Sequence, residues 1–305
     1  MISQVTMANR KPNGERVDGW LAVDKPAGPS SAKVVSISKQ LLSARKAGHG
    51  GTLDPFATGV LPIAFGEATK TVEYVMRGDK VYRFTIRWGE GRDTDDCQGT
   101  LVSTSNVRPS VREIEDALGF FQGEVEQVPP AFSAIKTGGR RAYAMARSGQ
   151  MPELMSRKVR IERLQLVSWD DENHATFEMA CGKGTYVRAL ARDLSAWLGT
   201  VGHVSELHRH RSGPFDETQA ISLDSLEALG HSSARSQCLL PVEAALADIP
   251  AIALTNIQAE KLRHGETIHV ESPETGVRCA MSSGRLIAIA EVANGKVRPK
   301  RVFNL

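Results

Sequence analysis

An aspartate in an unusual segment is the first candidate for chemistry. Residues 46–62 read KAGHGGTLDPFATGVLP, with four glycines and two prolines. Pro55 fixes its own φ angle and restricts Asp54 to an extended conformation, which presents the carboxylate in one direction. The glycines let the backbone approach a ligand closely. The segment fits either a carboxylate displayed to a ligand or an ordinary turn, and taken alone it does not separate the two.

Three other side chains could complete a site for a flat base. Tyr82 lies in residues 80–88, where alternate apolar side chains share one face of an expected strand. Arg188 lies on an expected helix after a glycine turn, and His49 precedes Asp54 by five residues. The ring would stack on the base, the guanidinium would orient the carboxylate, and the carboxylate would attack. Taken singly, Tyr82 also fits a core position and Arg188 an exposed helix face.

Motifs of several other enzyme classes are missing from the sequence. It has no G-x-x-x-x-G-K-[ST], no G-x-G-x-x-G after an expected strand, no H-E-x-x-H and no G-x-S-x-G. Nucleotide-driven, dinucleotide-dependent, zinc-protease and esterase chemistry are therefore disfavoured. The cysteines at 97, 181, 238 and 279 form no C-x-x-C pair, which argues against a zinc site and a disulfide framework. We expect reduced, mostly buried thiols.

The composition is typical of a soluble enzyme with more than one domain. The 305 residues are 41% hydrophobic and 24% charged, and this length exceeds the usual size of a single core. No stretch approaches the ~18–20 uncharged apolar residues that span a bilayer. Residues 1–18 are polar and lack the apolar region of a signal peptide. We expect them to be a flexible tail on a cytoplasmic protein.

Positive charge is concentrated in one segment, although the net charge of the chain is only +3. Residues 130–165 carry eight basic and two acidic side chains, so the rest of the chain is slightly acidic. Lys296, Arg298, Lys300 and Arg301 form a second basic cluster. This distribution indicates that the segment at residues 130–165 binds a polyanionic partner. It is also compatible with a solvated basic face.

Periodicity and capping signals predict alternating strands and helices. Ser30 or Ser31 begins a helix that reaches about residue 45, and Ser110 with Glu113 forms a capping box for a helix to about residue 121. Further helices are expected at 68–76 and 185–198, and strands at 20–23, 80–88, 159–169, 174–181 and 284–292. Between them we expect a loop at 46–62, a turn at 89–99 and a connection with helical pieces from 199 to about 250.

The expected turn at 89–99 contains Asp93, Asp95 and Asp96. Three close carboxylates suggest a cation site, but the Gly and Glu spacing of an EF-hand loop is absent. A structural or solvated turn is therefore the favoured interpretation. One of these carboxylates could also act beside Asp54 in a hydrolase.

The segment around Asp54 resembles the catalytic loop of the TruB family of tRNA pseudouridine synthases. Residues 48–62 match the family pattern G-H-x-G-x-L-D-P-x-A-x-G-x-L-P at every fixed position. Other segments resemble the family in the same order, namely D-K-P at 24–26, D-K-V-Y at 79–82, PPAFSAIK at 129–136, CGKGTYVR at 181–188, and His203 with Leu207. The resemblance covers residues 19 to about 250, and the C-terminal residues match more loosely.

Membership of this family implies an α+β fold with two domains. A pseudouridine synthase catalytic domain is expected at 19–250, with a mixed, largely antiparallel sheet, flanking helices and a thumb insertion at about 129–163. A small β-rich, PUA-like RNA-binding domain would follow at 251–305. The implied activity is isomerisation of one uridine in the T-loop of tRNA, at tRNA position 55, after base flipping. The resemblance also implies no cofactor, no metal, the T-arm of tRNA as partner, no membrane and a monomer.

The same resemblance assigns three catalytic roles. Asp54 matches the nucleophile of the family. Arg188 matches the arginine that pairs with the nucleophile and holds it ionised. Tyr82 matches a tyrosine that stacks on the target base and assists a later proton transfer.

Seven further residues are expected to bind or support the substrate. They are Lys25, His49, Lys136, Arg140, Arg141, Tyr186 and Leu207. His49 would fill the space that the flipped base leaves, while Lys25 and Leu207 would support the cleft. Many members have Leu-Arg-Arg where this chain has Leu207-His208-Arg209, so phosphate contacts there are expected to be sensitive to pH.

Two other functions stay open from the residues alone. A module that folds RNA without modifying it would not need Asp54, Tyr82 and Arg188 together. A glycoside hydrolase or N-ribohydrolase would use Asp54 with a second carboxylate that manages water. Release of free uracil would indicate the hydrolase.

Overall fold

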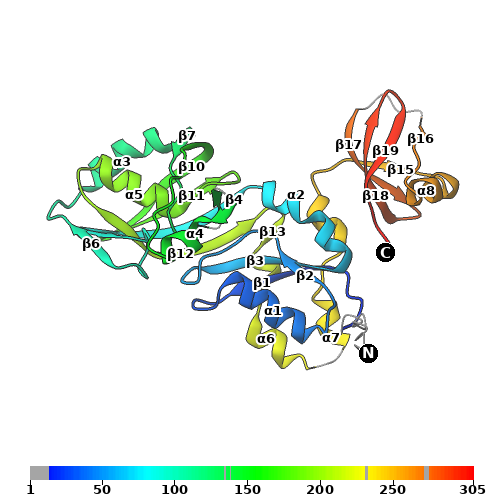
Figure 1. Cartoon of the computed structure of the whole chain (residues 1–305), viewed down its shortest axis with the longest axis horizontal. Helices are drawn as coiled ribbons and strands as arrows, with labels where there is room; N and C mark the ends of the chain where they lie inside the picture. Colours follow the sequence, from blue (N-terminus) through cyan, green and yellow to red (C-terminus); the bar gives the residue numbers. More distant parts are fainter. Residues whose placement is uncertain (1–13, 134, 138, 231–232, 271–274) are drawn as a thin grey trace, which may run out of the picture.

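The computed structural model describes residues 14–133, 135–137, 139–230, 233–270 and 275–305. Sheets of ten and five strands carry the fold, and two small two-stranded sheets accompany them (Figure 1). Among the described helices, none is long and apolar enough to cross a membrane. The predicted α+β class, with a large mixed sheet and a β-rich C-terminal part, is confirmed.

The large sheet is mostly antiparallel. Its main path has the order β14-β1-β3-β12-β4-β11-β10-β7, with β13 attached to β12 and β2 to β3. Only the β1–β14 and β12–β3 pairs among these described strands are parallel. In chain order the strands are β1 (Gly19–Lys25), β2 (Ala47–His49), β3 (Thr58–Phe65), β4 (Lys80–Trp88), β7 (Gly123–Gln127), β10 (Arg157–Asp171), β11 (His174–Cys181), β12 (Gly202–Ser212), β13 (Phe215–Asp216) and β14 (Ile221–Ser222).

Helices pack on this sheet in two groups (Figure 1). α1 (Ser31–Leu41) and α6 (Leu223–Ala228) contact each other beside β1, whereas α5 (Val187–Trp197) packs on β12 and β4, and α3 (Val111–Leu118) packs on β10. The side chain of Ser30 caps α1, and the capping box predicted for α3 is formed. Two short helices, α2 (Val72–Arg77) and α7 (Ser233–Gln237), complete this part of the chain.

The core between β4 and α5 is aromatic. Phe84 stacks on Phe177 with ring centroids 5.5 Å apart, and Trp88 meets Phe177 edge-on at 6.3 Å. Phe84, Ile86 and Trp88 are buried on the face of β4 that the alternation predicts. Tyr82 has the same parity and packs against this core while remaining partly exposed.

The smaller sheet stands apart from the large one (Figure 1). Its order is β15-β17-β18-β19-β16, and α8 (Asn256–Arg263) covers it. Its strands are β15 (Ala251–Ala253), β16 (Ile268–His269), β17 (Gly276–Ser282), β18 (Arg285–Ala293) and β19 (Lys296–Val302). One apolar cluster joins Trp20 and Val60 of the large sheet to Leu286 and Phe303. The domain boundary at residue 250 stays a prediction; the first strand of the smaller sheet begins at Ala251.

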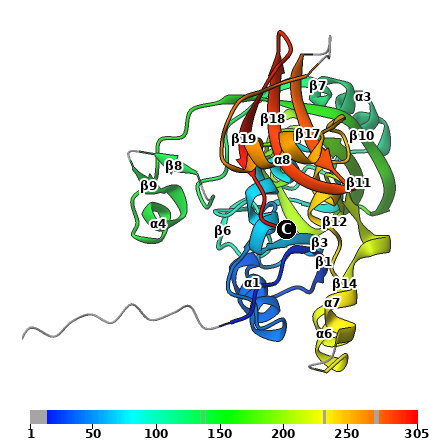
Figure 2. The same ribbon diagram turned by 90° about the vertical axis from the view of Figure 1, so that its right-hand side faces the viewer.

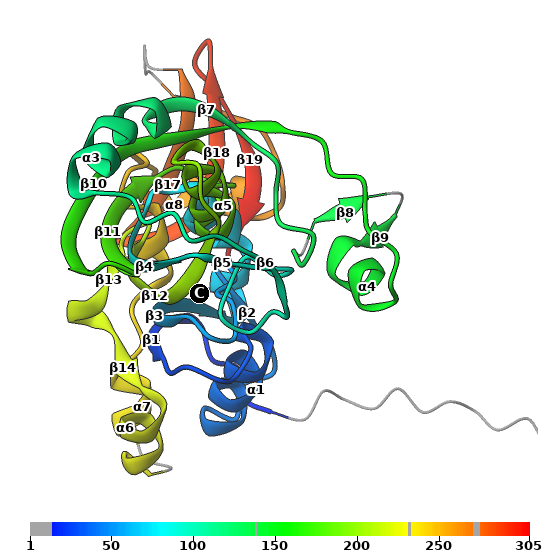
Figure 3. The ribbon, with the colours of Figure 1, turned by 90° about the vertical axis from the view of Figure 1, so that its left-hand side faces the viewer.

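A projection leaves the large sheet between β7 and β10, and residues 128–156 are termed the thumb below. It contains β8 (Lys136–Thr137), β9 (Arg140–Arg141) and α4 (Ala142–Arg147). Figures 2 and 3 show that these elements stand clear of both sheets. β10 begins at Arg157, so the last seven residues of the predicted insertion belong to the large sheet.

The predicted loop at 46–62 is wrong at both ends. β2 and β3 occupy most of its flanks, so only Lys46 and residues 50–57 are irregular. The apolar run in β3 is buried and pairs with β1 along its whole length. This pairing outweighs the local turn preference of Gly59 and Pro62.

The predicted helical connection from residue 199 misses a central strand. β12 lies between β3 and β4, in the middle of the large sheet. Its sequence, GHVSELHRHRS, is rich in charged and imidazole side chains, which are seldom buried unless they are paired. Arg209 is nevertheless 1% exposed. The local pattern indicates a solvated segment because its buried partners lie elsewhere in the chain.

Two other predicted boundaries also need correction. The helix expected to reach residue 45 ends at Leu41, and Ser43 beyond it has a φ of +48°. The expected turn at 89–99 contains β5 (Glu90–Arg92), which pairs with β6 (Leu101–Thr104).

Gly59→Ala is expected to destabilise the fold by more than backbone strain alone. Gly59 has a φ of +96°, and a Cβ there would lie 2.4 Å from the carbonyl oxygen of Arg209. Gly199→Ala is the matched control, because Gly199 has a φ of +71° and an added Cβ would meet nothing within 4 Å. Urea unfolding should give a loss of about 1–2 kcal/mol for the control and a clearly larger loss for Gly59→Ala. Equal losses would show that the close approach of β3 to β12 is not a constraint.

Candidate active site

The irregular loop at residues 50–57 is held by side chains from other elements. Lys25, at the end of β1, is completely buried. Its Nζ donates to the carbonyl oxygens of Pro26 at 2.9 Å, Pro55 at 3.0 Å and Ala57 at 2.6 Å. Backbone carbonyls outside regular structure need such donors when water is excluded. Lys25 therefore supports the loop through its backbone.

Arg209 of β12 supports the beginning and end of the same loop. Its Nε donates to the carbonyl oxygen of Val60 at 2.8 Å, while Nη1 and Nη2 donate to those of Thr52 at 3.3 Å and Gly51 at 3.1 Å. The predicted phosphate contact at this position is wrong for Arg209, because its guanidinium is buried and faces the loop.

Ser31 fixes the residue immediately before Asp54. Its hydroxyl donates to the carbonyl oxygen of Leu53 and accepts from the Leu53 N–H, both at 2.8 Å. Leu53 itself is buried. The backbone that presents Asp54 is therefore fixed from β1, α1 and β12 together.

The Asp54 carboxylate meets Arg188 from the first turn of α5. Arg188 Nη2 donates to Asp54 Oδ1 at 3.0 Å, and Nε lies 2.9 Å from Oδ2 without the alignment of a hydrogen bond. The Arg188 side chain is 4% exposed, whereas that of Asp54 is 30% exposed. The carboxylate is therefore fixed on one side by a buried cation and accessible to a ligand on the other.

The Arg188 guanidinium also joins two distant segments. Nη1 donates to the carbonyl oxygen of Thr94 at 2.9 Å and lies 3.4 Å from Asp96 Oδ2. Nη2 donates to the carbonyl oxygen of Phe132, at the base of the thumb, at 3.0 Å. These contacts fix the plane of the guanidinium and therefore the approach of Asp54 to it.

Burial and charge act on Asp54 in opposite directions. Burial raises its pKa, because desolvation disfavours the charged carboxylate. The charge and hydrogen bond of Arg188 lower the pKa, Asp96 raises it further, and Lys25 lowers it. Arg188 is thus the main group that favours an ionised Asp54.

Tyr82 lies on β4, between β11 and β12. Burial raises the pKa of its phenol, the Arg209 cation opposes this, and the negative charge of Asp54 adds to it. The phenol is therefore neutral at physiological pH and lies within electrostatic reach of Asp54. The structure thus brings Asp54, Tyr82 and Arg188 into one region, although β4, α5 and the loop are far apart in sequence.

Other predicted substrate-binding residues surround this region at different depths. His49 of β2 is half-buried, and its Nδ1 has no hydrogen-bond partner among the described residues. Burial lowers the His49 pKa, so the ring is neutral at pH 7. Leu207 is buried in the core. Tyr186 binds the Gln127 side chain through its backbone at 3.0 and 3.3 Å, and the Arg157 guanidinium lies 5.3 Å from its ring centroid.

The predicted contacts on the thumb are only partly described. Arg140 is exposed and donates to Gln150 Oε1 at 3.1 Å. The side chains of Lys136 and Arg141 lie outside the described part of the structure. Arg147 is exposed, and its guanidinium lies 4.7 Å from the ring centroid of Tyr143.

The three aspartates at 93–96 form a structural turn. Asp93 accepts hydrogen bonds from the backbone and hydroxyl of Thr100. Asp95 pairs with Arg192 at 3.3 Å, and burial raises the pKa of Asp95 to about 6. Asp96 accepts from the Gln98 N–H at 3.0 Å, besides facing Arg188. All three carboxylates have partners within the protein, which favours the structural interpretation of this turn.

Sequence reasoning missed Ser31, Asp96 and Arg209 as members of this site. Ser31 could have been found only as a capping candidate, since its bond to Leu53 spans 22 residues. The charged sequence around Arg209 could have indicated a functional position, but the same sequence also fits a solvated surface. The sequence predicts Asp96 as part of an acidic turn or as a second carboxylate of a hydrolase, and it does not indicate the contact with Arg188.

Three family models match consecutive parts of the chain. "TruB family pseudouridylate synthase (N terminal domain)" matches residues 39–187, "tRNA pseudouridylate synthase B C-terminal domain" matches 188–247, and "Pseudouridine synthase II TruB, C-terminal" matches 250–303. A Rhodospirillum rubrum protein named tRNA pseudouridine synthase B is 50% identical over 307 residues, covering 97% of this chain and 100% of that protein. A Caulobacter vibrioides protein of the same name is also 50% identical, with 98% and 100% covered.

Solved structures of other proteins share the fold. A chain from a structure of an H/ACA RNP bound to a substrate RNA containing 2′-deoxyuridine aligns with a TM-score of 0.72 at 22% identity. The alignment covers 100% of this chain and 94% of that one. At this identity the likeness shows the fold alone.

Lys25→Met should destabilise the protein, because the carbonyls of Pro26, Pro55 and Ala57 would lose their buried donor. The Pro55 carbonyl keeps the Gly28 N–H as a donor at 2.8 Å, so the loss falls mainly on Pro26 and Ala57. We expect a loss of about 2–5 kcal/mol in urea unfolding at pH 7, since each unsatisfied group costs roughly 1–3 kcal/mol. Lys33→Met on the exposed face of α1 is the control and should stay within about 0.5 kcal/mol of wild type. If Lys25→Met leaves the free energy of unfolding unchanged, Lys25 does not support the loop.

The comparison of wild type with Lys25→Met also predicts how stability changes with pH. Burial lowers the pKa of folded Lys25 to about 8, below the ordinary value of 10.5. Between these values the unfolded chain holds more protons, so the Lys25 contribution to stability increases from pH 8 to pH 10.5 and is lost as pH falls through 8. The stability difference between wild type and Lys25→Met should therefore grow in this window. A flat difference would contradict the lowered pKa.

Proposed function

The chain belongs to the TruB family of pseudouridylate synthases, and from this premise we propose that it converts one T-loop uridine, at tRNA position 55, to pseudouridine with Asp54 as nucleophile. Isomerisation of uridine in tRNA is the activity of this enzyme. The assignment of Asp54 rests on its ion pair with Arg188, in which Arg188 is buried and Asp54 is partly exposed. A nucleophilic carboxylate needs this combination of fixed charge and access.

The reaction conserves all atoms of the substrate. The C1′–N1 glycosidic bond breaks, the uracil turns, and C5 bonds to C1′. The C5 proton then leaves and N1 carries a proton in the product. A carboxylate nucleophile and a base for the C5 proton are sufficient, so the balance requires no external oxidant, reductant or group donor.

Each of the three site residues has a separate role in this reaction, which follows from its position. Asp54 supplies the nucleophile, and Arg188 favours its charged form in a partly desolvated site. Tyr82 presents a neutral phenol ring on the sheet side of the cleft, where it stacks on the uracil. Its hydroxyl then assists the movement of the C5 proton.

Recognition of tRNA must compensate for extracting the target base from its stack, which costs a few kcal/mol. His49 fits the space vacated by the base, since it carries a buried ring nitrogen without a partner in the described part of the protein. The exposed arginines of the thumb and the cluster at 296–301 on β19 supply phosphate contacts. Such contacts are blind to sequence, so selectivity comes from the shape of the T-loop and from the flipped base.

We also propose that the protein acts as a monomer in the cytoplasm. Asp54, Tyr82, Arg188 and the thumb belong to one chain, so this site needs no second copy. Sedimentation of the free protein and of its tRNA complex tests the stoichiometry.

Asp54→Asn should abolish turnover while leaving tRNA binding nearly intact, because the substitution removes only the nucleophilic charge. The measurement is tritium release from tRNA labelled at uracil C5, together with mapping of the product to the T-loop. Asp224→Asn on the exposed surface of α6 is the control and should keep full activity. Retained turnover in Asp54→Asn would exclude Asp54 as nucleophile, and free uracil from wild type would indicate a hydrolase.

Replacing Arg140 and Arg147 with Gln should weaken tRNA binding and flatten its salt dependence. Each phosphate contact that is lost should reduce the slope of log K against log[salt] by ~0.7–0.9. The control is the double variant Lys33→Gln and Arg112→Gln, since both side chains are exposed but lie on other elements. An unchanged slope in the thumb variant would mean that the thumb does not touch phosphate.

A further inference from the structure

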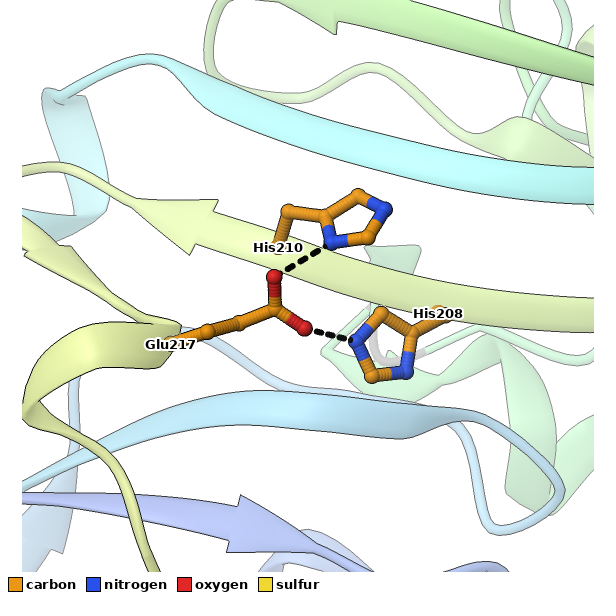
Figure 4. A group of neighbouring side chains, drawn as sticks. All are labelled: His208, His210 and Glu217. Atoms are coloured by element: carbon orange, nitrogen blue, oxygen red, sulfur yellow. Dashed lines mark hydrogen bonds and ion pairs between the residues drawn. The ribbon is translucent and has the colours of Figure 1, made fainter. Parts of the chain in front are cut away.

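Two histidines and a glutamate converge on the side of β12 that does not carry the Arg209 side chain. His208 and His210 are two residues apart on β12, so both point away from the face that carries Arg209. Glu217 opposes them from the turn after β13 (Figure 4). His208 Nε2 lies 2.6 Å from Glu217 Oε1, and His210 Nδ1 lies 2.6 Å from Oε2.

These three side chains are accessible to solutes. Their exposed fractions are 32% for His208, 30% for His210 and 49% for Glu217. A cavity of about 810 Å³ reaches His208 from one side, and a cavity of about 520 Å³ reaches His210 and Glu217 from the other. An ion can therefore enter without any movement of the backbone.

We propose that His208 Nε2, His210 Nδ1 and the Glu217 carboxylate bind one divalent transition-metal ion of the Zn²⁺ type, with water at the fourth position. Two imidazoles and one carboxylate are a common three-ligand set for Zn²⁺. The three ligand atoms lie within 4.8 Å of one another. Zn²⁺ at ~2.0–2.1 Å from each ligand requires spacings of about 3.4 Å, which rotation of partly exposed side chains can provide.

A neighbouring hydroxyl prepares His208 for this role. Thr58 Oγ1 lies 2.7 Å from His208 Nδ1 and has the carbonyl oxygen of Leu207 as an acceptor at 3.5 Å. The hydroxyl can therefore accept the Nδ1 proton, so an ion that replaces the proton between His208 Nε2 and Glu217 finds the Nε2 lone pair available. Such outer hydrogen bonds fix the tautomer and orientation of metal-binding histidines.

The charges around the cluster are mixed. Arg83 lies opposite His208 on β4, and Glu206 lines the larger cavity together with both. Glu162 and Asp216 line the smaller cavity together with Arg163 and Arg211. Arg163 is paired with Glu178 at 2.6 Å, which reduces its effect on a neighbouring ion.

The ion would act on structure and not on the reacting base. It would join β12 to the turn that carries Glu217, and through His208 it would reach Thr58 at the start of β3. Arg209 lies between the two histidines in sequence and faces the catalytic loop. Binding of the ion is therefore expected to stabilise the strand that holds this loop.

Titration of the full-length protein with Zn²⁺ alone tests the proposal. Isothermal calorimetry should show one ion per chain, and Zn²⁺ should raise the thermal unfolding temperature. His210→Gln and Glu217→Gln should each weaken Zn²⁺ binding at least about tenfold. His174→Gln is the matched control, because His174 is 33% exposed and also lies 3.0 Å from a carboxylate, that of Asp171. The control should bind Zn²⁺ like wild type.

Co²⁺ supplies a second readout that does not depend on stability. Wild type and His174→Gln should give the intense visible absorption of tetrahedral Co²⁺, and both site variants should lose it while near-ultraviolet circular dichroism shows that they remain folded. Zn²⁺ binding that is equal in wild type and His210→Gln would overturn the proposal. The proposal would also be overturned if His174→Gln weakened Zn²⁺ binding as strongly as Glu217→Gln does.

Discussion

The buried guanidinium of Arg188 is the interaction on which the rest of the site depends. It contacts the catalytic loop through Asp54, the acidic turn through Thr94 and Asp96, and the thumb through Phe132. A cation with 4% of its side chain exposed is costly to desolvate, and only several good partners can compensate. The same requirement that makes Arg188 stable therefore brings four distant segments together. Asp54 alone among these partners combines a negative charge with substantial exposure, which is what a nucleophile needs.

Two further buried cations, Lys25 and Arg209, stabilise the backbone of the loop that carries Asp54. The loop at residues 50–57 joins β2 to β3 without regular backbone pairing, so its carbonyl groups need donors. Lys25 of β1 and Arg209 of β12 donate six hydrogen bonds to backbone carbonyls, and four of these carbonyls belong to the loop. Because both donors come from strands, the strands fix the position of a loop that contains two glycines, Gly50 and Gly51. The loop can thus be irregular in conformation and still place Asp54 accurately.

β12 connects the two faces of the sheet. Leu207 and Arg209 point to the catalytic side, while His208 and His210 point to the other, because side chains alternate along a strand. Changes on the outer face can therefore alter the strand that supports the catalytic loop without entering the cleft. The smaller C-terminal sheet is connected to β1 and β3 through a shared apolar cluster that includes Val75 of α2 and Leu246.

The sequence by itself determined the features that depend on neighbouring residues. Alternation placed β4 at its observed bounds, the Ser110 and Glu113 pair marked the start of α3, and Pro55 indicated how Asp54 is presented. Residue types suggested Asp54, Tyr82 and Arg188 as one site but left core and surface positions open for Tyr82 and Arg188, and the family resemblance assigned their roles. Tertiary structure decided where the loop ends, that β12 is a central strand, and that Arg209 is a buried support. The reason is distance along the chain: Arg209 meets its carbonyl partners across 149 to 158 residues, and Arg188 meets Asp54 across 134. Periodicity and capping act within a few residues, so they cannot report whether a charged side chain will find a buried partner so far away.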